Sequence, residues 1–116
     1  MKLPNAHLAL VERDKIVGYL LNPIHRYGAN KARFFSDFGF TAQAWETLAE
    51  ALRVHGQRHE VAKTRETPFG PRYEVEGRLD APDGRQPRLR TVWQLDASNF
   101  GRLIDQPFRT RVKRRV

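Results

Sequence analysis

Apolar residues recur at helical spacing in the first part of the chain. Between Val11 and Leu21 they form one such segment, which ends at Asn22 because the following Pro23 disfavours helical backbone in the residue before it. A second segment begins at Asn30, a good helix cap, and stops at Gly39, the residue type that commonly follows a helix end. The pattern therefore predicts two helices before residue 40.

A third helix is predicted after Thr41, another capping residue. Its apolar residues lie at positions i, i+3, i+4 and i+7, which places them on one face: Trp45, Leu48, Ala49 and Leu52. Gly56 stands where this helix is expected to end.

Beyond Gly56 apolar and polar residues alternate with a period of two, which is typical of strands with one buried face. The predicted strands are His59 to Arg65, Tyr73 to Leu79, Arg88 to Leu95 and Arg102 to Phe108. A break at Pro68, Gly70 and Pro71 separates the first two, and Ala81 to Gly84 form the turn before the third. Helices followed by strands predict an α+β domain, with two or three N-terminal helices packed on a C-terminal antiparallel sheet of about four strands.

The composition narrows the class of protein. A chain of 116 residues, 40% of them hydrophobic, fits one compact domain. It has no cysteine, which excludes disulfides and thiolate zinc sites, and no apolar window approaches the ~18 residues that a membrane span needs. We therefore expect a soluble cytoplasmic protein that begins at its own Met1, without metal, cofactor or membrane contact.

The formal net charge of +8 is concentrated at the C-terminal end. Residues 109–116 contain four arginines and one lysine and no acid, which leaves +3 for residues 1–108. We therefore expect a domain over residues 1–108 and a basic tail over 109–116. Arg109, Arg111 and Lys113 are candidates for binding RNA phosphates, since clustered cations displace counterions from nucleic acids. A solubilising end is the equal alternative.

The segment from Asn22 to Phe40, NPIHRYGANKARFFSDFGF, places a histidine and a lysine around a glycine-containing turn that leads into a helix. Free amides at a helix start suit an anion such as phosphate. His25 lies in the loop and titrates near neutral pH, so it is a candidate proton handler. Lys31 lies in the first helical turn, where positive charge opposes the helix dipole, and a bound phosphate would explain this cost. A solvated surface role is the alternative for both residues.

The third predicted strand holds two competing candidates, because neighbouring strand residues point to opposite faces. Arg90 is suited to clamping a phosphate through its planar fork, and Thr91 to hydrogen-bonding a phosphate oxygen. The alternatives are a solvated arginine and an ordinary strand threonine. Arg78 is a weaker substrate-binding candidate, because Glu74 and Glu76 share its face and offer charge pairing.

Two further groups of residues fit simpler roles. His55, His59 and Glu60 lack the spacing of a compact helical metal-binding pair, so we expect no metal there. Tyr73 and Trp93 share strand faces with apolar residues, which favours core packing over base stacking.

The motifs LPNA, KIVGYLLNPIHRYGANKARFFSDFGF, AWETLAEALRVHG, FGPRYEVEGRL, PDGR and RTVWQLD occur in this order. Over residues 1–104 the chain resembles a family of small bacterial domains of unknown function. That family is more distantly similar to the ribonuclease-toxin superfamily of barnase, EndoU, the tRNA-cleaving colicins and RelE. The spacing from His25 to Lys31, with Thr91 in the third strand, resembles the superfamily's placement of active residues. The chain departs from its relatives near the end, where RLIDQPF replaces an RLITAYP-like segment.

The resemblance implies metal-independent RNA cleavage by a bacterial toxin that an acidic antitoxin or immunity protein controls. In this hypothesis His25 handles protons, Lys31 and Arg90 stabilise the phosphate, and Thr91 orients it. Two alternatives stay open. One is a non-catalytic nucleic-acid-binding module that uses the sheet face and the tail, and the other is an interaction protein that docks an acidic partner.

Overall fold

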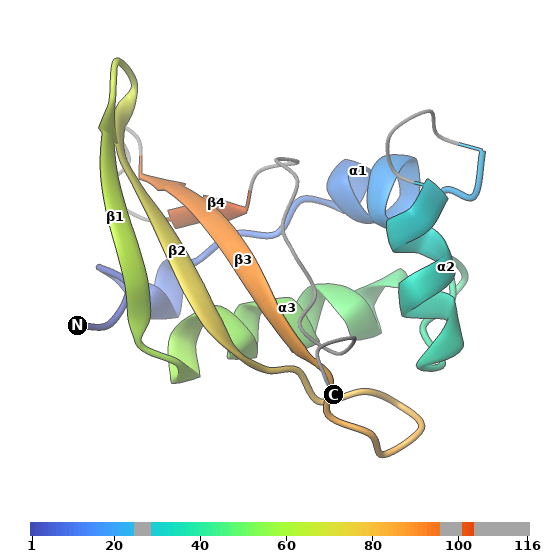
Figure 1. The fold of residues 1–116 in the computed structure, drawn as a ribbon. Helices are drawn as coiled ribbons and strands as arrows, with labels where there is room; N and C mark the ends of the chain where they lie inside the picture. Colours follow the sequence, from blue (N-terminus) through green and yellow to red (C-terminus); the bar gives the residue numbers. More distant parts are fainter. Residues whose placement is uncertain (25–28, 96–100, 104–116) are drawn as a thin grey trace.

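Helices come first in the structure and the sheet follows (Figure 1). The computed structural model describes residues 1–24, 29–95 and 101–103. The helical elements are η1 (Ala6–Leu8), α1 (Arg13–Lys15), η2 (Ile16–Leu20), α2 (Ala29–Asp37) and α3 (Trp45–Arg58). The strands are β1 (Val61–Thr67), β2 (Gly70–Arg78), β3 (Arg88–Leu95) and β4 (Gly101–Leu103). The predicted α+β class is confirmed.

The sheet is an antiparallel meander with the strand order β1-β2-β3-β4. The break predicted around residues 68–71 is a tight hairpin turn. In this turn the Thr67 hydroxyl donates to the Gly70 carbonyl at 2.6 Å and accepts from the Phe69 N–H at 3.2 Å. Gly70 has a φ of 119°, a backbone conformation that favours glycine. Because the turn is short, β1 ends at Thr67 instead of the predicted Arg65, and β2 begins at Gly70 instead of the predicted Tyr73.

The hydrophobic core lies between α3 and one face of the sheet, which we call the inner face (Figure 1). Inner-face residues alternate along the strands and are buried: Tyr73, Val75, Leu89, Thr91, Trp93 and Leu103. Leu48 and Leu52 of α3 and Phe35 of α2 are fully buried in the same cluster. The predicted apolar stripe of the third helix therefore forms part of the core.

The prediction that the third helix ends at Gly56 is wrong, because α3 continues to Arg58. A Cβ atom at residue 56 would lie 2.5 Å from Cζ2 of Trp93. Gly56 is therefore needed where α3 approaches the sheet, and it does not mark the helix end. The start also differs: α3 begins at Trp45, and Thr41 caps the preceding turn by accepting the Ala44 N–H at 3.2 Å.

Other predicted boundaries lie close to the observed ones. The helix predicted from Val11 to Leu21 is α1 followed by the π-helix η2, in which the Leu21 N–H donates to the Ile16 carbonyl five residues back, at 2.7 Å. Gly39 follows α2 with a φ of 98°, as a residue after a helix end should. The last predicted strand begins in β4, and its residues 104–108 lie outside the described part of the chain.

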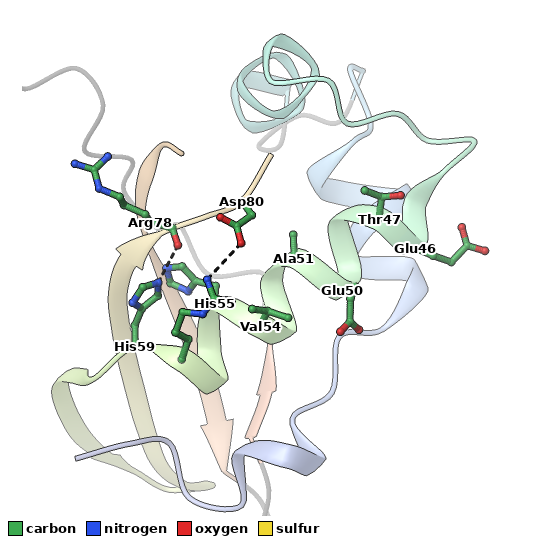
Figure 2. Close-up of a pocket in the computed structure, with 10 residues that line it drawn as sticks. Glu46, Thr47, Glu50, Ala51, Val54, His55, His59, Arg78 and Asp80 are labelled. Carbon is green, nitrogen blue, oxygen red and sulfur yellow. Dashed lines mark hydrogen bonds and ion pairs between the residues drawn. The ribbon is translucent and has the colours of Figure 1, made fainter. Parts of the chain in front are cut away.

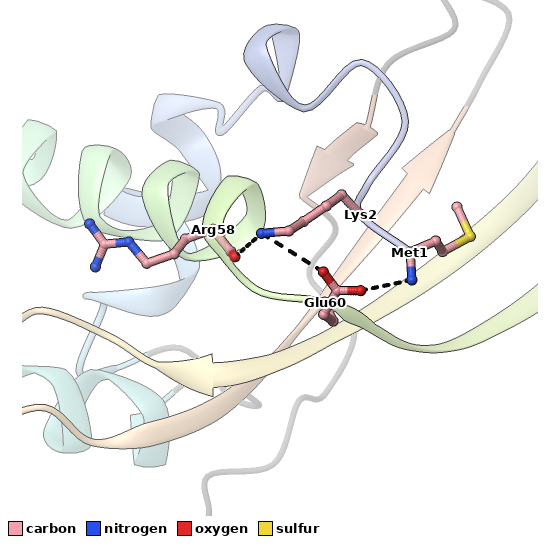
Figure 3. A network of polar contacts seen from close by, with 4 residues as sticks. All are labelled: Met1, Lys2, Arg58 and Glu60. Carbon is pink, nitrogen blue, oxygen red and sulfur yellow. Dashed lines mark hydrogen bonds and ion pairs between the residues drawn. The ribbon is translucent and has the colours of Figure 1, made fainter.

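The N-terminal segment contacts both edges of the sheet. Lys2 Nζ donates to the Arg58 carbonyl and lies 3.9 Å from Glu60 (Figure 3). The Val61 N–H donates to the Met1 carbonyl at 2.7 Å. At the opposite edge Leu10 forms a bridge with Arg102 of β4. The contacts of Met1 and Lys2 fix the chain where α3 passes into β1. Within the described residues, no helix has the length and apolar character needed to cross a membrane.

Candidate functional site

The face of the sheet turned away from α3, here called the outer face, is strongly basic. Within the described strands it carries two acidic residues, Glu74 and Glu76, and seven basic ones. The basic residues are Lys63, Arg65, Arg72, Arg78, Arg88, Arg90 and Arg102. The net charge of the outer face is therefore +5, so a surface on the body of the domain, and not only the C-terminal tail, suits an anionic ligand.

Two pairs of like charges lie directly opposite each other on the outer face. Arg65 of β1 is the register partner of Arg72 in β2, and Arg78 of β2 is the partner of Arg88 in β3. Like charges in this position destabilise a sheet. A bound polyanion would relieve this repulsion, which gives the arrangement a functional explanation.

Arg90 lies between these two pairs and holds both carboxylates of the outer face. Its Nη2 is 2.5 Å from Glu76 Oε2, its Nε donates to the same oxygen at 2.8 Å, and its Nη1 is 3.2 Å from Glu74 Oε1. The Arg90 side chain is 27% exposed and each glutamate side chain 17%. The cluster is therefore held in a defined geometry and still reaches the surface.

Of the remaining cations of the outer face, only Arg102 has an ion-pair partner among the described residues. Arg72 Nε donates to Gln94 Oε1 at 3.1 Å, and Arg78 Nη1 donates to the Gln86 carbonyl at 3.0 Å, and both of these acceptors are neutral. Arg102 lies 3.4 Å from Glu12. Within the described part of the chain, Lys63, Arg65 and Arg88 take part in no ion pair, so the excess positive charge of the face is not cancelled locally.

Thr91 points into the core, on the opposite side of the sheet from Arg90, as the alternation predicts. It is fully buried, and its Oγ1 accepts the Trp93 Nε1–H at 2.8 Å. The other polar contact of Thr91 is with His55 Nδ1, at 3.1 Å. His55 Nε2 lies 3.2 Å from the carbonyls of both Gly77 and Leu89, so it must donate and Nδ1 must accept. The hydroxyl of Thr91 is thus engaged in both directions, and its phosphate-orienting role stays a prediction.

Burial and the neighbouring His59 lower the pKa of His55 to about 4. The neutral ring is the form that this hydrogen-bond network requires. The network ties α3 to β2 and β3, and it gives His55 and Thr91 a structural role in the core.

The other predicted site residues lie elsewhere. Lys31 is half-buried in the first turn of α2, which packs against η2, and burial lowers the pKa of its ammonium group. The structure places it on a different element from Arg90 and Arg78, which share the outer face. His25, Arg109, Arg111 and Lys113 lie outside the described residues, so their roles stay predictions.

A pocket of about 540 Å³ opens between α3 and the end of β2 (Figure 2). His59 and Asp80 shape one side of it. His59 Nε2 lies 2.8 Å from the Arg78 carbonyl, and Asp80 accepts from Arg58 at 3.3 Å and from Gln86 at 2.7 Å. The His59 ring lies against the backbone of Gly77, where any Cβ would collide with it. Arg78 of β2 also lines the pocket, and the rest of the lining comes from α3: Glu46, Thr47, Glu50, Ala51, Val54, His55 and Arg58.

Glu74 and Glu76 were not predicted as site residues, because cross-strand or same-strand charge pairing was the expected role of the charged residues on this face. Their partner is Arg90, and Glu76 is its register partner in the neighbouring strand. Counting register outward from Ala81 and Gly84 would have placed Glu76 opposite Leu89, because the observed turn closes one residue later, between Ala81 and Arg85. His59 was predicted to begin the first strand, but it caps the end of α3, and β1 begins at Val61. The expectation that His55 and His59 lack a helical spacing was also wrong, because residues four apart are neighbours on a helix.

The fold is similar to that of a chain in the solved structure of a contact-dependent growth inhibition toxin–immunity protein complex from Klebsiella pneumoniae 342. The TM-score is 0.70 at 13% sequence identity, over 90% of this chain and 95% of that one. At this identity the similarity shows the fold. Among curated proteins, none matches the chain. The family model described as domain of unknown function DUF6883 matches residues 2–107, in agreement with the predicted resemblance. The chain therefore belongs to the DUF6883 family.

Proposed function

We propose that this protein is the RNA-cleaving toxin domain of a bacterial toxin–immunity pair and that the outer face of the sheet binds the RNA backbone. The observation that carries the proposal is the outer face itself, with a net charge of +5 and two arginine pairs placed directly opposite each other. Phosphates lying along the sheet would separate these arginines electrostatically and release counterions.

The Arg90 cluster supplies groups that RNA cleavage requires without a metal. The 2'-hydroxyl must lose a proton as its oxygen bonds to phosphorus, the departing 5'-oxygen must gain one, and the added negative charge must be stabilised. Arg90 suits the stabilising role through its planar fork. A phosphate that competes for Arg90 would release Glu76, whose carboxylate then accepts the 2'-proton. His25 is the proposed donor to the 5'-oxygen.

Similarity to a toxin–immunity complex leaves two roles for the chain, and charge favours one of them. A nuclease needs a cationic surface for its substrate, whereas a protein that covers such a surface gains affinity by being acidic. The formal net charge of +8 therefore supports the toxin role. The proposed partner is an acidic immunity protein that covers the outer face.

The test is incubation of the purified protein with total bacterial RNA in EDTA, followed by sizing of the products. We expect discrete fragments from the wild type. Arg90→Lys and Glu76→Gln should each cleave RNA at about one hundredth of the wild-type rate or below. Arg33→Lys on α2 and Glu66→Gln on β1 are matched controls at exposed positions. A His25→Ala, Lys31→Ala double variant tests the predicted turn. Equal cleavage by all variants would overturn this site, and intact RNA in every lane would overturn the activity.

A non-catalytic nucleic-acid-binding module is the second candidate. One observation favours it: within the described residues the outer face has no histidine, and Arg90 engages both carboxylates. This candidate predicts RNA binding without products. Deletion of residues 109–116, which carry +5, should then remove most of the affinity and flatten its dependence on salt.

A further inference from the structure

We infer that the pocket between α3 and the end of β2 is a nucleobase site, which receives one base of an RNA whose phosphates lie on the outer face. The inference rests on the proposed function and names a part of the substrate that it would recognise. The pocket and the outer face meet at Arg78, whose carbonyl lies 2.8 Å from His59 Nε2 at the pocket (Figure 2). The guanidinium group of Arg78 donates to the Gln86 carbonyl.

The charge of the pocket is less positive than that of the outer face and does not favour phosphate as its occupant. Three carboxylates line it, those of Glu46, Glu50 and Asp80, against the two guanidinium groups of Arg58 and Arg78. Asp80 is paired with Arg58, and Glu50 is paired with Arg53 at 2.6 Å. Glu46 forms no ion pair within the described part of the chain. Because the other two carboxylates are paired with arginines, Glu46 is left as a charged acceptor, which suits an uncharged group that donates hydrogen bonds.

The walls of the pocket suit a flat ring. Ala51 and Val54 supply apolar surface from α3, and the ring of His59 lies beside them, 4.9 Å from the ring of the buried His55. A volume of about 540 Å³ is in the range of pockets that bury small ligands. Bases are commonly recognised by stacking on such side chains, together with hydrogen bonds to their edges.

Carboxylates only accept hydrogen bonds, so they select bases by the donors that these bases carry. Adenine, cytosine and guanine each have an exocyclic amino group, whereas uracil presents carbonyl oxygens at the corresponding edge. The pocket should therefore prefer the amino-bearing bases to uracil. Glu46, the carboxylate without an ion-pair partner in the described residues, is the expected acceptor.

The experiment is a titration of the full chain with the four free nucleosides, followed by NMR signals of the Ala51 and Val54 methyl groups and the His59 ring. Nucleosides carry no phosphate, so the outer face cannot account for their binding. We expect saturable shifts with adenosine, cytidine and guanosine and weaker ones with uridine. Ala51→Leu should weaken binding about tenfold or more by filling the pocket, and Glu46→Gln about tenfold by removing a charged acceptor. Ala42→Leu and Glu66→Gln, at exposed positions outside the pocket, are the matched controls.

The outcomes separate this inference from the proposed function. If the protein cleaves RNA but no nucleoside shifts these signals, the base site is wrong and the nuclease proposal stands. If nucleosides bind as expected and RNA stays intact, the base site stands and the nuclease proposal fails. Binding of N-acetylarginine amide in place of nucleosides would overturn the base site in favour of a partner protein's arginine. The base site would also be overturned if Ala51→Leu bound each of the four nucleosides as tightly as the wild type does.

Discussion

Glu76 and Arg90 face each other across β2 and β3, and one carboxylate oxygen of Glu76 accepts from two guanidinium nitrogens, at 2.5 and 2.8 Å. Glu74 binds the third nitrogen of the same fork from the next position on its face. The only two acidic groups on the described outer face therefore both bind one arginine. As a result neither carboxylate neutralises the other basic residues of the face.

A Glu74→Gln, Glu76→Gln double variant should bind RNA more tightly and cleave it more slowly. The substitution raises the net charge of the outer face from +5 to +7, so binding should strengthen at low salt and depend more steeply on salt. Cleavage should slow because the proposed proton acceptor is lost. The measurement is fluorescence anisotropy of a labelled RNA across a salt series, beside the cleavage assay. Weaker or unchanged binding would contradict phosphate contact at this face.

The opposed arginine pairs should lower the stability of the fold and strengthen the binding of RNA. Arg65→Gln and Arg88→Gln each remove one member of a like-charge pair, and neither residue has an ion-pair partner among the described residues. Each variant should therefore be more stable by about 0.2–1 kcal/mol and should bind RNA more weakly. Urea denaturation and RNA binding measure the two effects. Arg33→Gln, on α2, is the control that removes the same charge away from the sheet. Loss of both stability and binding would indicate a structural role for these arginines.

The sequence predicted those features that depend on local alternation. The bounds of β3, Arg88–Leu95, follow from its period of two and the turn before it, and Arg90 and Thr91 lie on opposite faces as predicted. Features that depend on contacts distant in sequence were not predictable in this way. Glycine is common at helix ends, but Gly56 lies inside α3. It is explained by the indole of Trp93 in β3, which leaves no room for a side chain at this position. The Glu76–Arg90 pair and the pocket likewise require the register and packing of separate elements.

Gly56 and Gly18 provide a matched test of the helix–sheet contact. Both lie in helical elements, and a Cβ at Gly18 would meet nothing within 4 Å, whereas one at Gly56 would lie 2.5 Å from the Trp93 ring. Gly18→Ala should be neutral or stabilising by up to about 1 kcal/mol, because alanine favours helix. Gly56→Ala should destabilise by about 1–3 kcal/mol, because overpacking outweighs the gain in propensity. The free energy of unfolding in urea measures both. Equal stabilisation by the two substitutions would show that α3 and Trp93 are not in close contact.

The His55 network should make the fold sensitive to acid. Burial, with the neighbouring His59, lowers the pKa of His55 from 6.5 to about 4 in the folded protein. Between these values the unfolded chain binds a proton that the folded chain does not, so stability falls as the pH falls. The contribution is fully present above pH 6.5, and at most about 3 kcal/mol is lost by pH 4. Urea denaturation at several pH values measures this loss.

His55→Gln separates this contribution from the acid sensitivity of the carboxylates. At pH 7 the variant should be less stable than the wild type, because the side chain no longer joins Thr91 to the Gly77 and Leu89 carbonyls in the same geometry. On acidification it should lose less stability than the wild type, because no buried imidazole has to be protonated. His7→Gln, at an exposed position, should retain the wild-type dependence on pH. Parallel stability curves for the wild type and His55→Gln from pH 7 to pH 4 would show that the ring does not titrate against folding.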